Sequence, residues 1–239
     1  MTKYGMVIDL TRCMGCQACR VACKVENNTP QEIYWMYVFK KEVGKYPNVN
    51  YIFMPRPCMH CRNAPCVEVC PTKARHKRKD GVVLTNYNIC IGCKYCIAAC
   101  PYGVNYFNWE EPANKYYFQW KAGEGDGIYG SGKITTYTGG AIPPYKNPDH
   151  EKLYGGKIVS GGGHFKGIVE KCTFCVHRLP KRLEPACVSN CPVSALIFGD
   201  LDDPKSKVSQ FIATRRALQI KSELGTDPQV YYVLQRETK

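Results

Sequence analysis

The residues best able to do chemistry in this chain are its sixteen cysteines. They fall into four tight groups separated by long cysteine-free stretches, which argues against the disulfide framework of a secreted scaffold. Thiols held two or three residues apart suit metal binding instead. Groups I to IV are, in order, Cys13, Cys16, Cys19 and Cys23; Cys58, Cys61, Cys66 and Cys70; Cys90, Cys93, Cys96 and Cys100; and Cys172, Cys175, Cys187 and Cys191.

Groups I and III share the spacing C-x2-C-x2-C-x3-C, which is typical of [4Fe–4S] binding. Three thiolates at such intervals can surround one cubane, while the fourth lies a helical turn further on and goes to a second cluster. Gly15 and Gly92 let the backbone approach the sulfurs. Structural zinc, the main alternative, separates two C-x2-C knuckles by a long spacer and uses no third cysteine two residues on. The set therefore predicts iron–sulfur clusters, although group IV alone fits either metal.

Short β-branched stretches flank these groups and predict the elements that position them. "GMVIDLTRC", "GVVLTNYNIC" and "GIVEKC" precede groups I, III and IV, and "YGVNYFN" and "VSALIFGD" follow groups III and IV. A strand, a cluster loop, a short helix and a return strand form a ferredoxin-like half-unit. We expect an α+β chain of two bacterial-ferredoxin-like double-cluster modules related by pseudo-symmetry. Spacing alone does not fix which halves pair, but only nineteen residues separate groups II and III, which leaves group I with group IV.

Composition is consistent with a folded chain whose basic excess offsets anionic clusters. The 239 residues are 22% charged with a formal net charge of +13, and the mean hydropathy is −0.35. Four clusters would add roughly −8 to this charge and leave the loaded chain near +5. No nucleic-acid-binding module is present. We see no targeting segment, and the most apolar run, "IYWMYVF" at 33–39, is too short to span a bilayer.

Four stretches resemble the four-cluster iron–sulfur (beta) subunits of the dimethyl-sulfoxide-reductase superfamily, especially its polysulfide, tetrathionate, thiosulfate and arsenate reductase branch. They are "YGMVIDLTRCMGCQACRVACKVEN", "CMHCRNAPCVEVCPTKA", "DGVVLTNYNICIGCKYCIAACPYGVNYFN" and "KCTFCVHRLPKRLEPACVSNCPVSALIFGDLDDP". With the ending "SELGTDPQVYYV", the resemblance covers roughly residues 1–107 and 166–235.

The resemblance implies how the cysteines share four clusters. Some relatives lack one group III cysteine and carry a three-iron cluster, but this chain keeps all four, so we expect four [4Fe–4S] clusters. The implied ligands are Cys13, Cys16, Cys19 and Cys191 for cluster 1; Cys172, Cys175, Cys187 and Cys23 for cluster 2; Cys58, Cys61, Cys66 and Cys100 for cluster 3; and Cys90, Cys93, Cys96 and Cys70 for cluster 4.

The resemblance also implies the partners: a molybdenum or tungsten bis-pterin catalytic subunit next to the group I cluster, and an integral-membrane, quinone-linked anchor next to the group III cluster. The chain would be a peripheral member of a membrane-associated anaerobic respiratory complex of sulfur or arsenic oxyanion type. Either membrane face is compatible, by co-export with the catalytic subunit or in the cytoplasm. It would have no active site of its own, because no nucleophile–base set or dinucleotide fingerprint appears.

The expected domain boundaries follow from these groups. Residues 1–50 and 166–203 form the module of groups I and IV, and 51–107 form that of groups II and III. Residues 108–165, with twelve of the 21 glycines, form a Gly/Tyr-rich insertion that we expect to pack on a partner, with a self-packed surface excursion as the alternative. Residues 204–239 form a C-terminal arm, with a helix opened by Pro204 that presents Val208, Phe211 and Ile212 on one side.

Other side chains carry weaker expectations. His60 and His177 lie within cysteine groups that already have four thiols, so we expect supporting or surface roles. The run "RHKRKD" at 75–80 predicts a solvated hairpin turn, and "IYWMYVF" predicts core or interface. Lys24, Lys94 and Lys171 directly follow or precede cysteines and could raise cluster potentials.

Three alternatives to the respiratory oxyanion complex stay open. One is the equivalent subunit of a formate dehydrogenase-like complex. Another is a free-standing soluble polyferredoxin, which would gain little from the long insertion and the arm. The third is a zinc-structured scaffold, which an iron-free preparation with stoichiometric zinc would establish.

Overall fold

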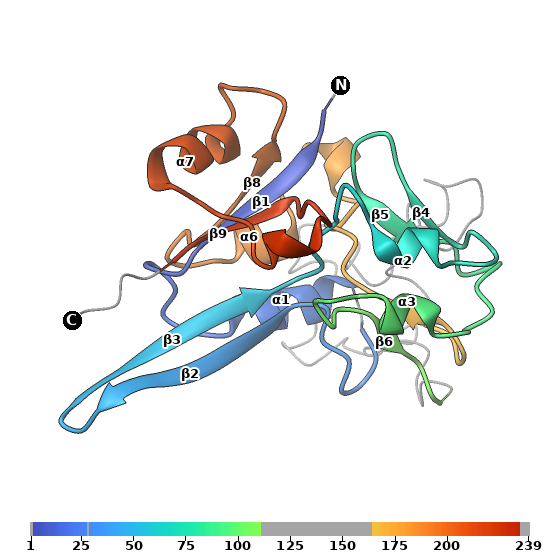
Figure 1. Ribbon diagram of the computed structural model, residues 1–239, viewed down its shortest axis with the longest axis horizontal. Coiled ribbons are helices and arrows are strands. Elements are labelled where there is room, and N and C mark those ends of the chain that lie inside the picture. The colour runs from blue at the N-terminus through green and yellow to red at the C-terminus, as the bar shows by residue number, and fades with distance from the viewer. Residues whose placement is uncertain (1, 28, 111–163, 235–239) are drawn as a thin grey trace, which may run out of the picture.

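The two ends of the chain meet in one sheet. The computed structural model describes residues 2–27, 29–110 and 164–234, with β1 (Tyr4–Asp9) between β8 (Leu196–Asp200) and β9 (Val230–Val233) (Figure 1). Strand β1 pairs antiparallel with β8 and parallel with β9. Its side chains from Met6 to Ile8 are fully buried, as expected for a β-branched strand covered on both faces. The segment 204–239, expected as an arm, thus supplies a strand to the central sheet.

Helix α7 (Lys207–Arg215) covers this sheet beside β8. Val208 is buried against Val7, and Phe211 and Ile212 pack around them, so the predicted apolar face is confirmed. The predicted start at Pro204 is wrong by a few residues. Ser206 is the N-cap because its Oγ accepts a hydrogen bond from the Ser209 N–H at 3.2 Å.

In the described part of the chain, the remaining strands form three two-stranded ribbons. The longest joins β2 (Tyr37–Lys45) to β3 (Asn48–Arg56) and projects from the body (Figure 1). The others join β4 (Arg75–Lys77) to β5 (Val83–Thr85) and β6 (Tyr106–Phe107) to β7 (Val169–Glu170). The strands predicted around groups I, III and IV are therefore confirmed. Because β6 follows group III and β7 precedes group IV, their pairing crosses the boundary expected between the two modules.

The core lies between the ribbons and the central sheet. Trp35, Met36 and Val38 are buried in it, which confirms a core role for part of "IYWMYVF", whereas Phe39 of the same run is exposed. The remaining elements are short: α1 (Ala18–Asn27), α2 (Pro65–Glu68), α3 (Tyr95–Ala98), α6 (Ala186–Ser189) and the 3-10 turns Leu179–Lys181 and Ser222–Leu224. Within the described ranges, no helix has the length and apolarity needed to cross a bilayer. Most of the expected 108–165 insertion lies outside the described residues.

Candidate cluster-binding sites

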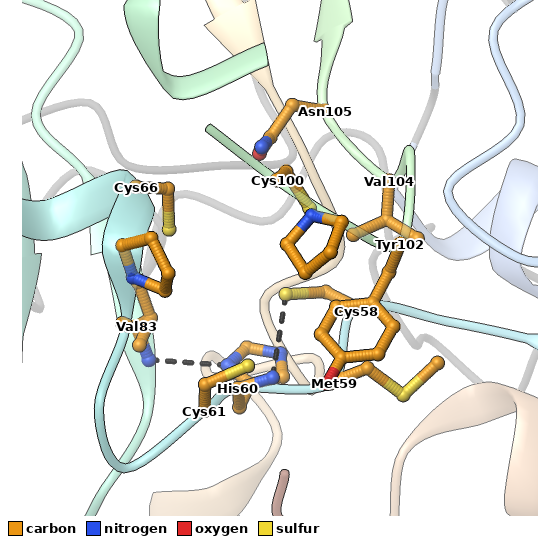
Figure 2. Close-up of a pocket in the computed structure, with 13 residues that line it drawn as sticks. Cys58, Met59, His60, Cys61, Cys66, Val83, Cys100, Tyr102, Val104 and Asn105 are labelled. Carbon is orange, nitrogen blue, oxygen red and sulfur yellow. Dashed lines mark hydrogen bonds between the residues drawn. The ribbon is translucent and has the colours of Figure 1, made fainter. Parts of the chain in front are cut away.

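The fold gathers the sixteen cysteines into four sets, and each set takes three thiols from one sequence group and one from another. Three of the sets, 1, 3 and 4, each line a small cavity of about 20 Å³. Figure 2 shows the thiols of set 3 pointing into their cavity. The sets are Cys13, Cys16, Cys19 and Cys191 (set 1); Cys23, Cys172, Cys175 and Cys187 (set 2); Cys58, Cys61, Cys66 and Cys100 (set 3); and Cys70, Cys90, Cys93 and Cys96 (set 4).

Set 2 is identified by mutual electrostatics and burial. All four of its thiols are buried. The pKa of Cys187 is raised well above its ordinary value by burial and by the charges of Cys175, Cys23 and Cys172. The pKa of Cys23 is raised in the same way by burial and by Cys172 and Cys175. Asn27 Nδ2 donates to Cys23 Sγ at 3.6 Å and to Cys175 Sγ at 3.7 Å, so the thiol from group I lies beside those of group IV in one interior site.

Each short helix presents a cysteine at the same place. The third cysteine of every group is the second residue of its helix, in α1, α2, α3 and α6. In groups II to IV, a proline follows the fourth cysteine and ends the helix, since proline cannot continue the hydrogen-bond ladder. Helices of four residues are too short to be stable alone. Their conformation therefore depends on packing and on whatever the thiols hold.

Backbone N–H groups surround the sulfurs. Such donors are expected around sulfur atoms that carry the negative charge of an iron–sulfur cluster. They run from His60 to Cys58 (3.4 Å), Arg75 to Cys70 (3.3 Å), Phe174 to Cys172 (3.5 Å) and Ala195 to Cys191 (3.2 Å).

The thiols need a cationic centre to be held as thiolates. Burial and neighbouring thiols raise the pKa of Cys19 and Cys61 to about 12, and the pKa of Cys66 to about 11. Four thiolates cannot share a low-dielectric cavity unless positive charge sits among them. Iron supplies that charge, so the donor set fits a cluster. In the described residues, no three His, Cys, Asp or Glu side chains are arranged around a point that could hold a single metal ion.

One cationic residue near the sulfurs was missed by the sequence interpretation. Arg75 is only 1% exposed, and its Nη2 donates to Cys96 Sγ at 3.4 Å. The prediction of a fully solvated run at 75–80 is therefore wrong for this residue, whereas Lys77 and Lys79 are exposed and the turn at Gly81 is present. The sequence signal that could have identified Arg75 is its position shortly after Cys70–Pro71, where the backbone turns back toward Cys70.

The two histidines are buried rather than on the surface, and both have partners other than sulfur. His60 Nδ1 accepts a hydrogen bond from the Val83 N–H at 3.1 Å (Figure 2). Burial and the charges of Lys171 and Arg75 hold its pKa well below the ordinary value, so the ring is neutral. His177 Nε2 pairs with Glu26 Oε1 at 2.6 Å. Supporting roles fit both residues, and the surface alternative is wrong.

The three lysines adjacent to cysteines differ in their surroundings. Lys24 Nζ donates to loop carbonyls, including Thr29 O at 3.0 Å. Lys94 lines the set 4 cavity and is partly exposed, and its Nζ lies 3.6 Å from the centroid of the Trp109 ring. Only Lys171 is buried, at 2% exposure, so it is the one whose charge is least screened by solvent.

Four sets of four thiols, held on short helices and approached by N–H donors, define an iron–sulfur protein. Comparison with known proteins agrees: residues 49–117 and 89–196 match families described as 4Fe-4S dicluster domains. These matches and the sixteen cysteines account for four [4Fe–4S] clusters.

Similar proteins identify the family of this chain more narrowly. The arsenate respiratory reductase iron–sulfur subunit of Shewanella sp. strain ANA-3 is 45% identical over 97% of this chain and 96% of its own length. A polypeptide of the polysulfide reductase of Wolinella succinogenes is 36% identical over 97% and 94%, and one of the tetrathionate reductase of Salmonella typhimurium is 35% identical over 97% and 72%. This protein belongs to the same family of iron–sulfur, electron-transfer subunits of respiratory reductases, and it is not a catalytic subunit.

Proposed function

We propose that sets 1 to 4 are the ligand sets of the four clusters, and that they form one linear relay with ends at sets 1 and 4. The observation that carries this proposal is exposure. Cys16 of set 1 and Cys93 of set 4 are the two exposed cysteines among the sixteen, all of which are described. Set 2, in contrast, is entirely buried. An electron can therefore enter or leave near the surface at either end and pass through the interior between them.

Electrostatic interactions between the sets support the order 1–2–3–4. Cys19 of set 1 raises the pKa of Cys187 in set 2, after the effects of burial and of the nearer thiols. Cys58 of set 3 is the strongest influence after burial on Cys172 of set 2, whose pKa is about 12. Arg75 hydrogen-bonds to Cys96 of set 4, and its charge also acts on Cys66 and Cys58 of set 3. Each set thus has neighbours on the proposed path.

Repeated geometry supports two pseudo-symmetric modules, residues 1–50 with 166–203 and residues 51–107. The loop of group I has positive φ at Gly15 (72°) and Gln17 (65°), and the loop of group III repeats this at Gly92 (65°) and Lys94 (64°). In groups II and IV, the residue before the second cysteine also has positive φ, 44° at His60 and 53° at Phe174. Under this proposal, residues 108–165 are an insertion, and the segment from 204 onward contributes β9 to the central sheet.

The family supports the identity of the partners. We assign the set 1 end to a molybdenum or tungsten bis-pterin catalytic subunit and the set 4 end to a quinone-linked membrane anchor, in a complex that reduces a sulfur or arsenic oxyanion. The relatives named for arsenate and tetrathionate reductases support the oxyanion class, and the relative named for polysulfide reductase supports sulfur chemistry. A relative named as the cluster-binding subunit of a menaquinone reductase supports the quinone link. The chain is then peripheral to the membrane, on the face that the catalytic subunit occupies.

The test separates the two ends of the relay. The complex is purified without oxygen, and Cys93→Ser is introduced at the set 4 end. Quinol-driven reduction of the terminal acceptor should be lost, while reduction driven by a viologen dye that donates directly to the catalytic subunit should persist. Retention of quinol-driven activity would contradict the proposed order. Elution of an isolated monomer with no partner would favour a free-standing polyferredoxin, and formate oxidation would favour the formate dehydrogenase-like complex.

A further inference from the structure

Two cations lie in the interior of the protein without a carboxylate partner. Arg75 is 1% exposed and Lys171 is 2% exposed. Within the described ranges, neither side chain forms an ion pair with Asp or Glu, and Nε and Nη1 of Arg75 have no hydrogen-bond partner there. An uncompensated buried charge costs several kcal/mol in general. Some other negative charge must therefore balance these two side chains.

Arg75 touches set 4 and faces set 3. It is the first residue of β4, and its backbone N–H donates to Cys70 Sγ at 3.3 Å. Its guanidinium donates to Cys96 Sγ at 3.4 Å, so the backbone and the side chain of Arg75 each donate to a sulfur of set 4. Its charge also interacts with Cys66 and Cys58, which belong to set 3. Arginine does not lose its proton in proteins, so this positive charge is permanent.

Lys171 lies at the next junction, between sets 3 and 2. It precedes Cys172 of set 2 in the sequence, and its Nζ donates to the carbonyl of Cys172 at 2.9 Å and to the carbonyl of Val83. Its charge interacts with Cys172 and with Cys66 of set 3. Carbonyl oxygens orient the ammonium group but do not neutralise it. The neighbouring sulfurs are the remaining source of negative charge.

These positions have a direct consequence for reduction. Each one-electron reduction adds a negative charge to a cluster, and a nearby positive charge stabilises the reduced form. The stabilisation is strong where the surroundings are dry, because neither solvent nor a carboxylate screens the charge. A cation at a junction stabilises the reduced form on both sides. Set 3 lies next to both cations, because Lys171 donates to the carbonyl of Val83, which lines the set 3 cavity, and the charge of Arg75 acts on Cys66 and Cys58. Among the described residues, Arg75 and Lys171 are the buried Arg and Lys side chains, and neither contacts set 1.

We propose that Arg75 and Lys171 are junction cations that raise the reduction potentials of neighbouring clusters in pairs, Arg75 for sets 3 and 4 and Lys171 for sets 2 and 3. Set 3 receives both contributions, so the two cations together raise its reduction potential more than that of any other cluster. This inference rests on the ligand sets of the proposed function. Both side chains act on the clusters through their positive charge, since neither ligates iron in the proposed sets.

The test is a potentiometric titration of the purified complex, followed by electron paramagnetic resonance, with Arg75→Gln and Lys171→Met. Signals are assigned by replacing one cysteine of each set with serine. Arg75→Gln should shift the reduction equilibria of sets 3 and 4 about tenfold toward the oxidised form, which is about 59 mV for a one-electron couple. Lys171→Met should shift those of sets 2 and 3. Set 3 should respond to both substitutions, and set 1 to neither.

Charge-preserving variants and a surface control make the result specific. Arg75→Lys keeps the charge but loses the forked donor, so it should lower the potential of set 4 and leave that of set 3 unchanged. Lys171→Arg should leave both of its clusters close to wild type. Lys79→Met removes an exposed lysine near Arg75 in sequence and should shift no cluster. If Arg75→Gln does not retain its clusters, Arg75→Lys decides the question alone through the difference between sets 3 and 4.

The results that would contradict this inference differ from those that would contradict the proposed function. Unchanged potentials in both charge-removing variants would overturn the inference, as would an equal shift of all four clusters or a comparable shift with Lys79→Met. If the wild-type complex holds four clusters and passes electrons while the potentials ignore Arg75 and Lys171, only this inference fails. Fewer than four clusters in the wild type, or electron passage independent of Cys93, would instead remove the proposed function.

Discussion

The imidazole of His60 stacks on the ring of Phe174, with 3.8 Å between the centroids and 27° between the planes. Each residue immediately precedes the second cysteine of its group, and each donates its backbone N–H to the sulfur two positions earlier. The stack therefore joins the loops of groups II and IV, which are more than a hundred residues apart in sequence. Phe174 also packs edge-on against Phe198 of β8, at 5.3 Å. The pair links two cluster loops to the central sheet.

We predict that Phe174→Ala strongly destabilises the protein. Phe174 is buried, and removal of a buried phenylalanine ring costs about 3–5 kcal/mol through lost transfer energy and a residual cavity. The apparent unfolding midpoint, followed by the visible absorbance of the clusters, should fall accordingly. Phe39→Ala is the matched control because Phe39 is 39% exposed on the β2–β3 ribbon, and surface changes usually cost within about 0.5 kcal/mol. Equal losses in the two variants would contradict a role for the stack.

A second prediction concerns the close approach of two cluster-flanking loops at Gly92. A Cβ at this position would lie 2.1 Å from the carbonyl oxygen of Gly167, and φ is +65°. Gly225 has nearly the same φ, +64°, but a Cβ there would meet nothing within 4 Å. Backbone strain of about 1–2 kcal/mol is therefore common to both alanine variants, and the contact is the difference.

We expect Gly92→Ala to lower the iron content and weaken the signal of the set 4 cluster, because Gly92 lines that cavity. Gly225→Ala should keep four clusters and lose only a little stability. The measurements are iron per chain and the electron paramagnetic resonance signals of the reduced protein. A Gly92→Ala protein with full iron and the stability of Gly225→Ala would show that the loops can separate without loss of the site.

A third prediction is a pH dependence at the buried pair of His164 and Glu170. Their Nδ1 and Oε1 atoms are 2.7 Å apart, and His164 Nε2 donates to the Asn27 carbonyl at 3.0 Å, so both ring nitrogens are used as donors. Burial alone would lower the pKa of His164, but the Glu170 carboxylate and the Asn27 carbonyl outweigh burial and raise it. A raised folded-state pKa adds stability that is fully present below the unfolded value of about 6.5 and is lost as pH rises through the folded value.

The wild-type protein should therefore lose stability as pH rises from about 6.5 into the alkaline range, and His164→Gln should lose this component. The measurement is the thermal midpoint against pH for both proteins. His76→Gln is the control, because His76 is only partly buried and contacts the Ala74 carbonyl rather than a carboxylate. An unchanged slope in His164→Gln would assign the pH dependence to other groups.

The sequence predicted the cluster chemistry better than it predicted how segments far apart in the chain pack together. Cysteine spacing predicted clusters, and β-branched stretches predicted β1, β5, β6, β7 and β8, because both signals are local. The β2–β3 ribbon and the addition of β9 beside β1 were not predicted. The ribbon was missed because charged residues such as Lys40, Lys41 and Glu42 interrupt the alternation of apolar and polar residues expected of a strand. The pairing of Met6 with Val230 was missed because it is set by packing across the whole chain.

Arg75 shows most clearly what could not be predicted from the sequence alone. A basic run usually lies on the surface, because burial of a charge needs a compensating partner. Here the compensating charge comes from cysteines of groups II and III, and their closeness to Arg75 exists only in the folded chain. The rule therefore fails at Arg75 because the sulfurs that compensate its charge come together only in the folded chain.

The last prediction follows from the exposure of Cys16 and Cys93. Oxidants attack sulfur ligands according to their access, so clusters with an exposed ligand should be lost first. When the reduced chain without its partner subunits is exposed to air, the signals of sets 1 and 4 should decay before that of set 2, whose four cysteines are buried. Electron paramagnetic resonance at intervals after exposure would measure the order.

Set 2 is the internal control, because it lies in the same chain under the same conditions. In the assembled complex, decay at sets 1 and 4 should slow, since a subunit that exchanges electrons with an end must cover it. Simultaneous decay of all sets would mean that oxidation follows global opening of the fold rather than local access. Slowing at only one end would mean that a single partner covers the chain, and this would contradict a relay between two subunits.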